Sequence, residues 1–476
     1  MIKKSIFFLW VIFISWTGRA QLPNLPWAKQ VGAKQFPSGK KIFYVNSFGA
    51  RSDTVTINTK AIQKAIDACA KAGGGVVAFK PGTYVTGSIF LRSNVHLKID
   101  EGVLLLGSQS LGDYPEIDTR IAGIEMKWPA ALINIIDAHN VAVTGKGTVN
   151  ARGKFCWDKY WAMRKAYEPR GLRWIVDYDA KRVRTFLTQN ASDITLKNIT
   201  FKNAGFWTVQ LLYSTRLTVD GVVIRNNEDG HGPSTDGIDV DSSTWVLIEN
   251  CDIDCNDDDF CLKAGRDWDG LRVNKPTEYV VIRHCIARKG GGLLTLGSET
   301  SGGIRNVLAH DLQAIKTGQG FHIKSTTTRG GTVENIYLQR IKMDSVRNAF
   351  HFTMDWNPAY SNAILPDGYD YDSIPSHWKT LLQRVDPPSK GIPVFRNIYV
   401  SDIEATGITN HIIFCNGLAQ SPAKNFNFTN IKISGSTAGT ISNADGWKFT
   451  NVAIEGKDGK KLEVKNVRNM QLGPGI

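Results

Sequence analysis

A short phrase of alternating apolar and polar residues recurs along most of this chain. Each copy has two apolar residues separated by one residue, then an Asn, Asp or His, then further apolar positions. Most copies follow one another at roughly 20 to 35 residues, a spacing typical of solenoids and propeller blades. Alternation with a period of two predicts short β-strands. The copies are Ile194–Ile199, Leu217–Val222, Val246–Cys251, Val280–Cys285, Val333–Ile336, Phe395–Ile398, Phe426–Ile431 and Trp447–Val452.

The repeat predicts an all-β fold, a single-stranded right-handed parallel β-helix whose coils stack at about 4.8 Å. The 45 glycines and the scarcity of long helical patterns agree with coils of short strands. Uneven spacing between the copies disfavours a propeller. A short capping helix is predicted at the amino end, over residues 58–69, because Asn58 is a good capping residue and Gly73–Gly75 follow. This helix would cover the open end of the stack.

Two stretches interrupt the repeat, at residues 153–185 and 355–393. Both are rich in aromatic residues and are predicted to be loops inserted between coils. Such loops commonly carry function, and their rings either stack on sugar rings or pack over the coil surface. Residues 21–476, with these insertions, are predicted to form a single parallel β-helix domain.

Residues 1–20 are predicted to be a signal peptide, because a basic start and an apolar run precede small residues at Gly18 and Ala20. The apolar run is too short to span a bilayer. We therefore expect an exported protein, periplasmic or secreted, without a membrane span. The net charge of +13 suits a polyanionic partner or serves solubility alone. The seven cysteines include no CxxC pair, and they are expected to fill the interior as small apolar residues rather than bind a metal.

Four neighbouring coils between residues 230 and 326 can be aligned by their alternation. One inward row then contains Ile238, Phe260, Leu294 and Phe321. A second inward row contains Val240, Leu262, Leu296 and Ile323. This register places Asp236 and Asp258 at the same position of adjacent coils, with Asp257 one residue earlier.

Carboxyl groups one coil apart repel each other when both are ionised, so one of them tends to keep a proton. Such a pair can supply the general acid and the general base that glycosidic cleavage requires. Lys263, His322 and Lys324 are predicted on the same face, where they could bind a sugar carboxylate. Aspartates are also common in turns, so a structural role is the alternative for any single one. Further candidates for substrate binding are Asp239, Asp259 and Arg266.

These motifs together resemble glycoside hydrolase family 28, the group of polygalacturonases and rhamnogalacturonases. The family's Asn-Thr-Asp motif corresponds to Ser234–Asp236, and its Gly-Asp-Asp motif corresponds to Asn256–Asp258, followed by Lys263–Gly265. Segments Phe43–Ala50 and Gly74–Tyr84 are similar to the family's amino-terminal cap. The resemblance covers most of residues 21–476.

The resemblance implies an inverting, single-displacement hydrolysis of α-galacturonosyl linkages in pectic polysaccharide, with no metal or organic cofactor. It further implies that Asp257 protonates the leaving oxygen as the general acid. Asp236 and Asp258 would activate the attacking water as the general base. The partner implied is an acidic plant cell-wall polysaccharide, and we expect the chain to act as a monomer.

Two family motifs differ in this chain. The family's Gly-His-Gly is replaced by Gly290–Gly292, and its Arg-Ile-Lys is replaced by His322–Lys324. In polygalacturonases that arginine and lysine are associated with the galacturonate on the leaving-group side. Histidine lacks the bidentate fork with which arginine binds a carboxylate. We therefore expect a leaving group other than galacturonate, most simply rhamnose, and a substrate of the rhamnogalacturonan rather than the homogalacturonan type.

Three alternatives stay open at this point. One is an exo-polygalacturonase of the same family. Another is a pectate-lyase-like β-helix, in which residues 257–259 could ligate calcium through their carboxylates. The third is a glycan-binding or adhesive β-helix without catalysis. Nucleic acid is not expected as a partner because the basic residues are dispersed. Attack within the chain and attack at its end are both compatible with the motifs.

Overall fold

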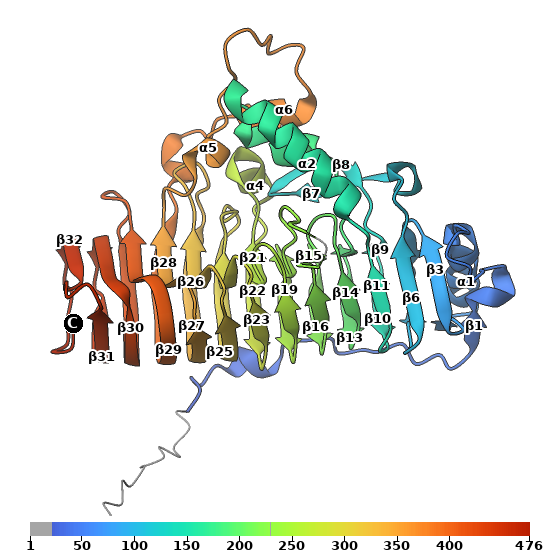
Figure 1. Cartoon of the computed structure of the whole chain (residues 1–476), viewed down its shortest axis with the longest axis horizontal. Helices are drawn as coiled ribbons and strands as arrows, with labels where there is room; N and C mark the ends of the chain where they lie inside the picture. Colours follow the sequence, from blue (N-terminus) through green and yellow to red (C-terminus); the bar gives the residue numbers. More distant parts are fainter. Residues whose placement is uncertain (1–20, 229) are drawn as a thin grey trace, which may run out of the picture.

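The computed structural model describes residues 21–228 and 230–476 as one long stack of coils (Figure 1). Neighbouring coils pair in parallel through three ladders of strands that run along the stack. The predicted signal peptide, residues 1–20, lies outside the described residues. Among the described residues, no helix is both long and apolar enough to cross a membrane.

The first ladder carries the site described below. Its strands are β4 (Ile89–Leu91), β9 (Ile133–Ile136), β12 (Phe186–Gln189), β15 (Val209–Leu212), β18 (Ile238–Asp241), β21 (Phe260–Lys263), β24 (Gly292–Leu296), β26 (Gln319–Lys324), β28 (Asn348–Thr353), parts of β29 (Val394–Asn416) and β30 (Ala423–Asp445), and β32 (Glu463–Arg468).

The other two ladders complete each coil. The second comprises β1 (Ile42–Tyr44), β2 (Gly75–Ala78), β5 (Val95–Lys98), β10 (His139–Thr144), β13 (Ser192–Lys197), β16 (Thr215–Asp220), β19 (Thr244–Glu249), β22 (Thr277–Arg283), β25 (Ile304–Ile315), β27 (Thr332–Asp344), β29, β30 and β31 (Lys448–Gly456). The third comprises β3 (Gly82–Thr86), β6 (Val103–Gly107), β11 (Thr148–Asn150), β14 (Thr200–Lys202), β17 (Val223–Arg225), β20 (Asp252–Asp254), β23 (Ile286–Arg288) and the later parts of β25, β27, β29, β30 and β31.

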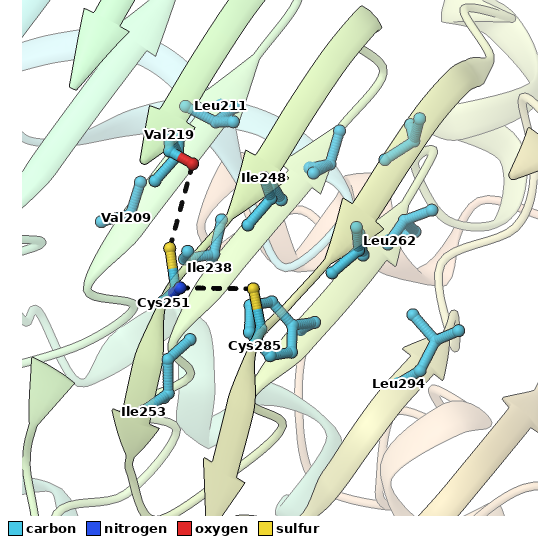
Figure 2. Close-up of a cluster of buried hydrophobic side chains, with 14 of the residues drawn as sticks. Val209, Leu211, Val219, Ile238, Ile248, Cys251, Ile253, Leu262, Cys285 and Leu294 are labelled. Atoms are coloured by element: carbon cyan, nitrogen blue, oxygen red, sulfur yellow. Dashed lines mark hydrogen bonds between the residues drawn. The ribbon is translucent and has the colours of Figure 1, made fainter. Parts of the chain in front are cut away.

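The core fills the inside of the coils with stacked apolar side chains. The predicted register is confirmed, because Ile238 pairs with Phe260, Phe260 with Leu294, and Leu294 with Phe321. Figure 2 shows part of these rows, with Ile238 and Leu294 beside side chains from the other ladders. Burying apolar rows of this kind stabilises the stack by about 25 cal/mol for each Å² removed from water.

The polar residue of most repeated phrases has a left-handed backbone, and in Leu217–Val222 Gly221 takes this conformation beside Asp220. Asn250 has φ 57°, Asn335 φ 55° and Asn397 φ 57°, a conformation that asparagine tolerates better than most side chains. Their amides also bond between coils, as in the hydrogen bond of 3.3 Å from Asn397 Nδ2 to Asn335 Oδ1. The phrase thus marks the sites where each coil turns.

The predicted capping helix is α1 (Thr59–Lys71), at one end of the stack (Figure 1). Asn58 is at its N-cap position, but the Asn58 side chain accepts a hydrogen bond from the Arg51 backbone N–H at 2.7 Å. It therefore joins the preceding segment to the helix. Ile62, Ala65, Ile66 and Cys69 form the buried face of α1, which covers the end of the core.

The insertion at residues 153–185 is helical, so the prediction of loops is wrong for most of it. Trp157 and Tyr160 lie three residues apart on one face of a helix and are buried, and the Trp157 indole N–H donates to the carbonyl of Ala204 at 2.9 Å. The helices of the two insertions are α2 (Lys154–Tyr167), α3 (Val176–Asp179), α5 (Pro358–Ser361) and α6 (Ser376–Leu382). Other elements outside the ladders are α4 (Asp267–Val273), the antiparallel hairpin β7 (Glu116–Ile121) and β8 (Ile124–Pro129), and the 3-10 turns η1 (Pro26–Lys29), η2 (Val45–Phe48), η3 (Leu111–Asp113), η4 (Glu168–Arg170), η5 (Arg173–Ile175) and η6 (Pro388–Gly391).

Candidate active site

The first ladder brings the predicted acids together. Asp236 and Asp258 each lie two residues before a paired strand position, at Ile238 of β18 and Phe260 of β21. The Gly237 backbone N–H donates to the carbonyl of Asp258 at 2.9 Å, which continues the ladder into this turn. Asp236 and Asp258 therefore lie on neighbouring coils, and each has an oxygen within 4.8 Å of the other. The predicted vertical register of the acids is present.

The acids open into a small cavity with room of about 100 Å³ for water-sized molecules. Charged and aromatic side chains make up most of its lining. The lining residues are Ala122, Arg173, Asp177, Phe206, Trp207, Ser234, Asp236, Asp257, Asp258, Lys263, Ser298, Glu299, Lys324, Trp356 and Tyr360.

Asp258 is held as a carboxylate. Lys324 Nζ lies 2.8 Å from Asp258 Oδ2, and Thr295 Oγ1 donates to Asp258 Oδ1 at 2.7 Å. Burial disfavours this charge, but the Lys324 and Lys263 ammonium groups outweigh burial and lower the pKa of Asp258 to about 2. Asp258 therefore favours the ionised form.

Asp257 and Asp236 are pushed the other way. Burial and the neighbouring Asp258 carboxylate raise the pKa of Asp257 above its usual value. Burial, together with Asp239 and Asp257, raises the pKa of Asp236 well above its usual value. Asp257 is the half-buried member of the three, and its Oδ1 accepts the Asp258 backbone N–H at 3.0 Å. The site thus combines one ionised carboxylate with two carboxyl groups that favour the protonated form.

Lys263 lines the cavity and lies among acids. Its Nζ is 3.6 Å from Asp236, 3.5 Å from Asp239 and 3.6 Å from Glu299, and it lies 4.8 Å from the centre of the Trp207 ring. Burial opposes the charge of Lys263, but the surrounding acidic groups raise its pKa well above the usual value. This ammonium group moderates the repulsion among the buried carboxyl groups.

The acid cluster offers a metal ion an unsuitable set of donors. Oxygens of Asp236 and Asp258 and the thiol of Cys261 lie within 4.8 Å of one another. Burial raises the pKa of the Cys261 thiol well above its usual value, whereas metal binding needs the thiolate. Lys324 already occupies one Asp258 oxygen. This donor set does not suit a cation.

Four predicted substrate-binding residues are buried beside the cavity rather than in its lining. Asp239 and Asp259 are fully buried, beside Lys263 and Cys255 respectively. His322 stacks edge-on against His351 of the next coil, with ring centres 5.1 Å apart. Of the predicted substrate-binding residues, Lys263 and Lys324 reach the cavity.

Arg266, the fourth, joins separate segments beneath the cavity wall. Its Nη1 donates to Tyr178 Oη at 2.7 Å, and its Nη2 donates to the Ser361 carbonyl at 3.1 Å. Its backbone N–H donates to the carbonyl of Gly123 in the hairpin, and its Nε lies 2.9 Å from Asp267. Arg266 therefore ties together both insertions and the β7–β8 hairpin.

Sequence patterns missed Asp177, Trp207 and Glu299, because each lies outside the repeated phrase. Asp177 pairs with Arg182 at 2.7 Å and with Arg173 at 2.8 Å. Of these three, Asp177 lies in an insertion whose aromatic richness was an available signal, and the same signal marked the segments that supply Arg173, Trp356 and Tyr360. Trp207 and Glu299 lie outside both insertions.

A second apolar cluster lies beside the cavity and forms what we call the wall: the β7–β8 hairpin and residues 153–185 and 355–393. Trp174 packs edge-on against Trp378 with ring centres 5.4 Å apart, and the Arg173 guanidinium lies over the Tyr360 ring at 5.0 Å. Figure 1 shows these elements gathered above the middle coils. Apolar members of the cluster are Ile121, Ala122, Ile124, Trp128, Leu172, Trp174, Ile175, Tyr178, Phe206, Trp207, Ile374, Trp378 and Leu381.

The sequence profile of glycosyl hydrolases family 28 matches residues 91–365. The chain belongs to this family. The profile described as rhamnogalacturonase A/epimerase, pectate lyase-like, matches residues 42–112. A probable polygalacturonase of Vitis vinifera is 32% identical over 335 residues, which cover 68% of this chain and 65% of that relative. An exo-poly-alpha-D-galacturonosidase of Dickeya chrysanthemi is 25% identical, over 88% of this chain and 75% of that relative.

Solved structures support the fold class. The exopolygalacturonase of Thermotoga maritima superposes with a TM-score of 0.68 at 23% identity, over 92% of this chain and 95% of that chain. The family 28 exopolygalacturonase of Yersinia enterocolitica superposes with a TM-score of 0.70 at 21% identity, over 91% and 79% of the two chains. The predicted right-handed parallel β-helix is confirmed.

Proposed function

We propose that this protein hydrolyses α-galacturonosyl linkages in pectic polysaccharide by an inverting acid–base mechanism. The observation that carries the proposal is the group of Asp236, Asp257 and Asp258 at the floor of one cavity, with Lys263 and Lys324 beside them. Family membership and relatives named as polygalacturonases agree with this chemistry. The mechanism requires no metal, because a carboxylic acid and a carboxylate supply both proton transfers.

The three acids have different proposed roles, which follow from their protonation states. Asp257, half-buried and with a raised pKa, keeps the proton that the leaving oxygen needs. Asp258, ionised beside Lys324, accepts a proton from the attacking water. Asp236 lies within 4.8 Å of Asp258, so its carboxyl group orients the same water. The Lys263 ammonium group reduces the electrostatic repulsion among these carboxyl groups.

We further propose a rhamnogalacturonan rather than a homogalacturonan substrate. His322 stands where the family's polygalacturonases have arginine, and here it is buried against His351. Burial and the Lys324 charge hold the pKa of His322 well below its usual value, so the ring is neutral. A neutral, buried ring offers little to a galacturonate carboxylate, whereas the leaving rhamnose of rhamnogalacturonan has none.

The test compares the parent protein with Asp257→Asn on rhamnogalacturonan and on unmethylated polygalacturonate, by reducing-sugar release. Loss of general acid catalysis is expected to lower turnover by about 10²–10⁴-fold. Asp252→Asn is the matched control, because Asp252 pairs with Arg288 on the opposite ladder. The control should hydrolyse at the parent rate, and a chelator should leave the rate unchanged.

Parent-level hydrolysis by Asp257→Asn would remove Asp257 from its role. Faster release of galacturonate from polygalacturonate than from rhamnogalacturonan would instead assign the enzyme to the exo-polygalacturonase type. Products that carry an unsaturated, ultraviolet-absorbing end would identify a lyase.

A further inference from the structure

The outer surface of the first ladder is covered by other parts of the protein on the amino-terminal side of the acids. Ala131, Arg184 and Trp207 occupy, in the three preceding coils, the position that Asp236 occupies in its own coil. Trp207, beside the acids, lines the cavity, whereas Ala131 and Arg184 are 0% exposed and do not line it. A polysaccharide lying along this ladder could therefore contact Trp207 but not the positions of Arg184 and Ala131.

The opposite side of the acids is more open. Gln319 lies two residues before Phe321 and so takes the position of Asp258 two coils later. Gln319 and the neighbouring Gly318 are half-buried, and Arg347 in the next coil is exposed. Further along the same ladder, His351 and Phe414 are half-buried. In the coil between Asp258 and Gln319, Gly292 is buried and Gly291 is half-buried, so the accessible surface extends from Gly291 toward the carboxyl-terminal coils.

The first insertion closes the covered side tightly. The Arg182 guanidinium lies 4.4 Å from the centre of the Tyr160 ring and 4.1 Å from that of Phe206. Its Nη1 donates to the carbonyl of Pro233, three residues before Asp236, at 2.8 Å. The Trp128 indole N–H of the hairpin donates to the carbonyl of Arg182 at 2.7 Å. Hydrogen bonds and rings therefore lock the wall against the coil that carries Asp236.

The wall is continuous from the hairpin to the second insertion. Asp179 accepts hydrogen bonds from His377 at 2.6 Å and from the Trp378 indole at 3.0 Å. Arg266 ties Tyr178 to the backbone of Ser361. A chain that crossed the acids toward the amino-terminal coils would have to separate these buried contacts.

We propose that the site acts on chain ends, releasing a terminal sugar unit, and that the rest of the polysaccharide leaves over the carboxyl-terminal coils. The proposal rests on the hydrolysis proposed above. The terminal sugar would occupy the cavity against Arg173, Asp177 and Trp207. Cleavage within a chain needs accessible floor on both sides of the acids, and the wall removes one side. The exposed Arg347 guanidinium suits an acidic polymer on the open side.

The experiment uses three versions of one rhamnogalacturonan oligosaccharide: unmodified, blocked by O-methylation of its non-reducing terminal sugar, and blocked by a bulky label at its reducing end. The unmodified oligosaccharide should lose one terminal unit at a time from the earliest samples. One of the two blocked versions should resist hydrolysis, because its modified end cannot enter the cavity. The other blocked version should be degraded as fast as the unmodified oligosaccharide.

Early fragments of intermediate length, or degradation of both blocked versions, would overturn chain-end action and leave the hydrolase assignment intact. Absence of hydrolysis of every version, and of polygalacturonate, would overturn the proposed function and the chain-end inference with it. The outcomes therefore separate the two claims.

A pair of variants tests the direction of the polymer. Arg347→Ala should raise KM severalfold for long substrates and leave kcat near the parent value. Lys342→Ala is the control, since Lys342 is exposed on another ladder beside Glu404. An unchanged KM in Arg347→Ala would overturn the assignment of the open side to the carboxyl-terminal coils.

Discussion

Asp258 accepts hydrogen bonds from Lys324 and Thr295, whereas Asp236 faces the carboxyl groups of Asp239 and Asp257. The side chains are identical in chemistry, and the difference in charge comes from their neighbours alone. An ammonium group at 2.8 Å compensates burial, while nearby carboxyl groups add to its effect. The direction of each pKa shift thus follows from how closely a lysine approaches the carboxyl group, since Lys324 lies 2.8 Å from Asp258 and Lys263 lies 3.6 Å from Asp236.

Replacing Lys324 with Met should therefore shift the pH dependence of catalysis. Without the ammonium group, burial is no longer outweighed, and the pKa of Asp258 should rise by about 1–3 units from its value of about 2. The protonated form of Asp258 cannot act as a base, so the acidic limb of the kcat/KM profile should move to higher pH. Measurement of kcat/KM across pH checks this.

Lys316→Met is the control for that profile. Lys316 is exposed, directly follows β25, and is not part of the cavity lining. An acidic limb at the same pH in Lys324→Met and in the parent would show that Lys324 does not set the charge of Asp258. The lowered pKa of Asp258 also predicts that the parent protein loses folded stability at low pH. A carboxyl group with a lowered pKa stabilises the fold above its unfolded pKa and loses this contribution as pH falls.

At the scale of elements, one buried arginine contacts all three parts of the wall. Arg266 contacts α3 through Tyr178, α5 through Ser361 and the hairpin through Gly123. Asp267, its ion-pair partner, is shared with Arg329. Three elements that pair with none of the ladders are thereby held in one arrangement around the cavity.

Arg266→Met should loosen the wall while the coils stay folded. Several buried hydrogen bonds to a charged group are lost, at a cost of about 3 kcal/mol or more. We expect turnover to fall at least tenfold and proteolytic cuts to appear within 153–185 and 355–393. Limited proteolysis with mass spectrometry, beside far-ultraviolet circular dichroism, measures both effects.

Arg305→Met provides the comparison, because Arg305 forms a half-exposed pair with Glu278 between coils. Surface pairs contribute about 0–1 kcal/mol, so this variant should resemble the parent. Equal proteolysis of the two variants would show that Arg266 does not hold the wall.

At the scale of the whole molecule, the stack is stabilised by packing rather than by covalent cross-links. Within residues 21–228 and 230–476, all seven cysteines are buried and none forms a disulfide. Cys251 and Cys285 lie on adjacent coils, and the Cys251 backbone N–H donates to Cys285 Sγ at 3.4 Å (Figure 2). These thiols behave as small apolar residues of the core, as expected from the sequence.

Thiol titration tests this interpretation on the intact protein. In the native protein, no cysteine should react with a thiol reagent. Burial shields the cysteines and raises the pKa of the Cys251, Cys255 and Cys261 thiols. Unfolded protein should react at seven sites. A reductant should leave the melting temperature unchanged. A count of five after unfolding would reveal a disulfide, and Cys251 with Cys285 would be the first pair to examine.

The coil architecture and the row of acids could be predicted from the sequence. Stacking partners in a β-helix come from successive copies of one pattern, so aligning the copies aligns the side chains. Asp236 and Asp258 were found in this way, and so was the inward row through Ile238 and Phe260. The turn asparagines belong to the same class, because left-handed backbone favours them locally.

The wall was decided by the tertiary structure. Its contacts join segments far apart in the chain, such as Asp179 and His377, which are 198 residues apart. No periodic pattern encodes such a contact. The sequence therefore suggested Arg266 as a substrate-binding residue, because its buried partners could not be predicted. The aromatic side chains revealed that the insertions pack against something, and only folding determined that they pack against each other beside the acids. Repetition makes near-neighbour coils predictable, whereas single long-range contacts depend on the whole fold.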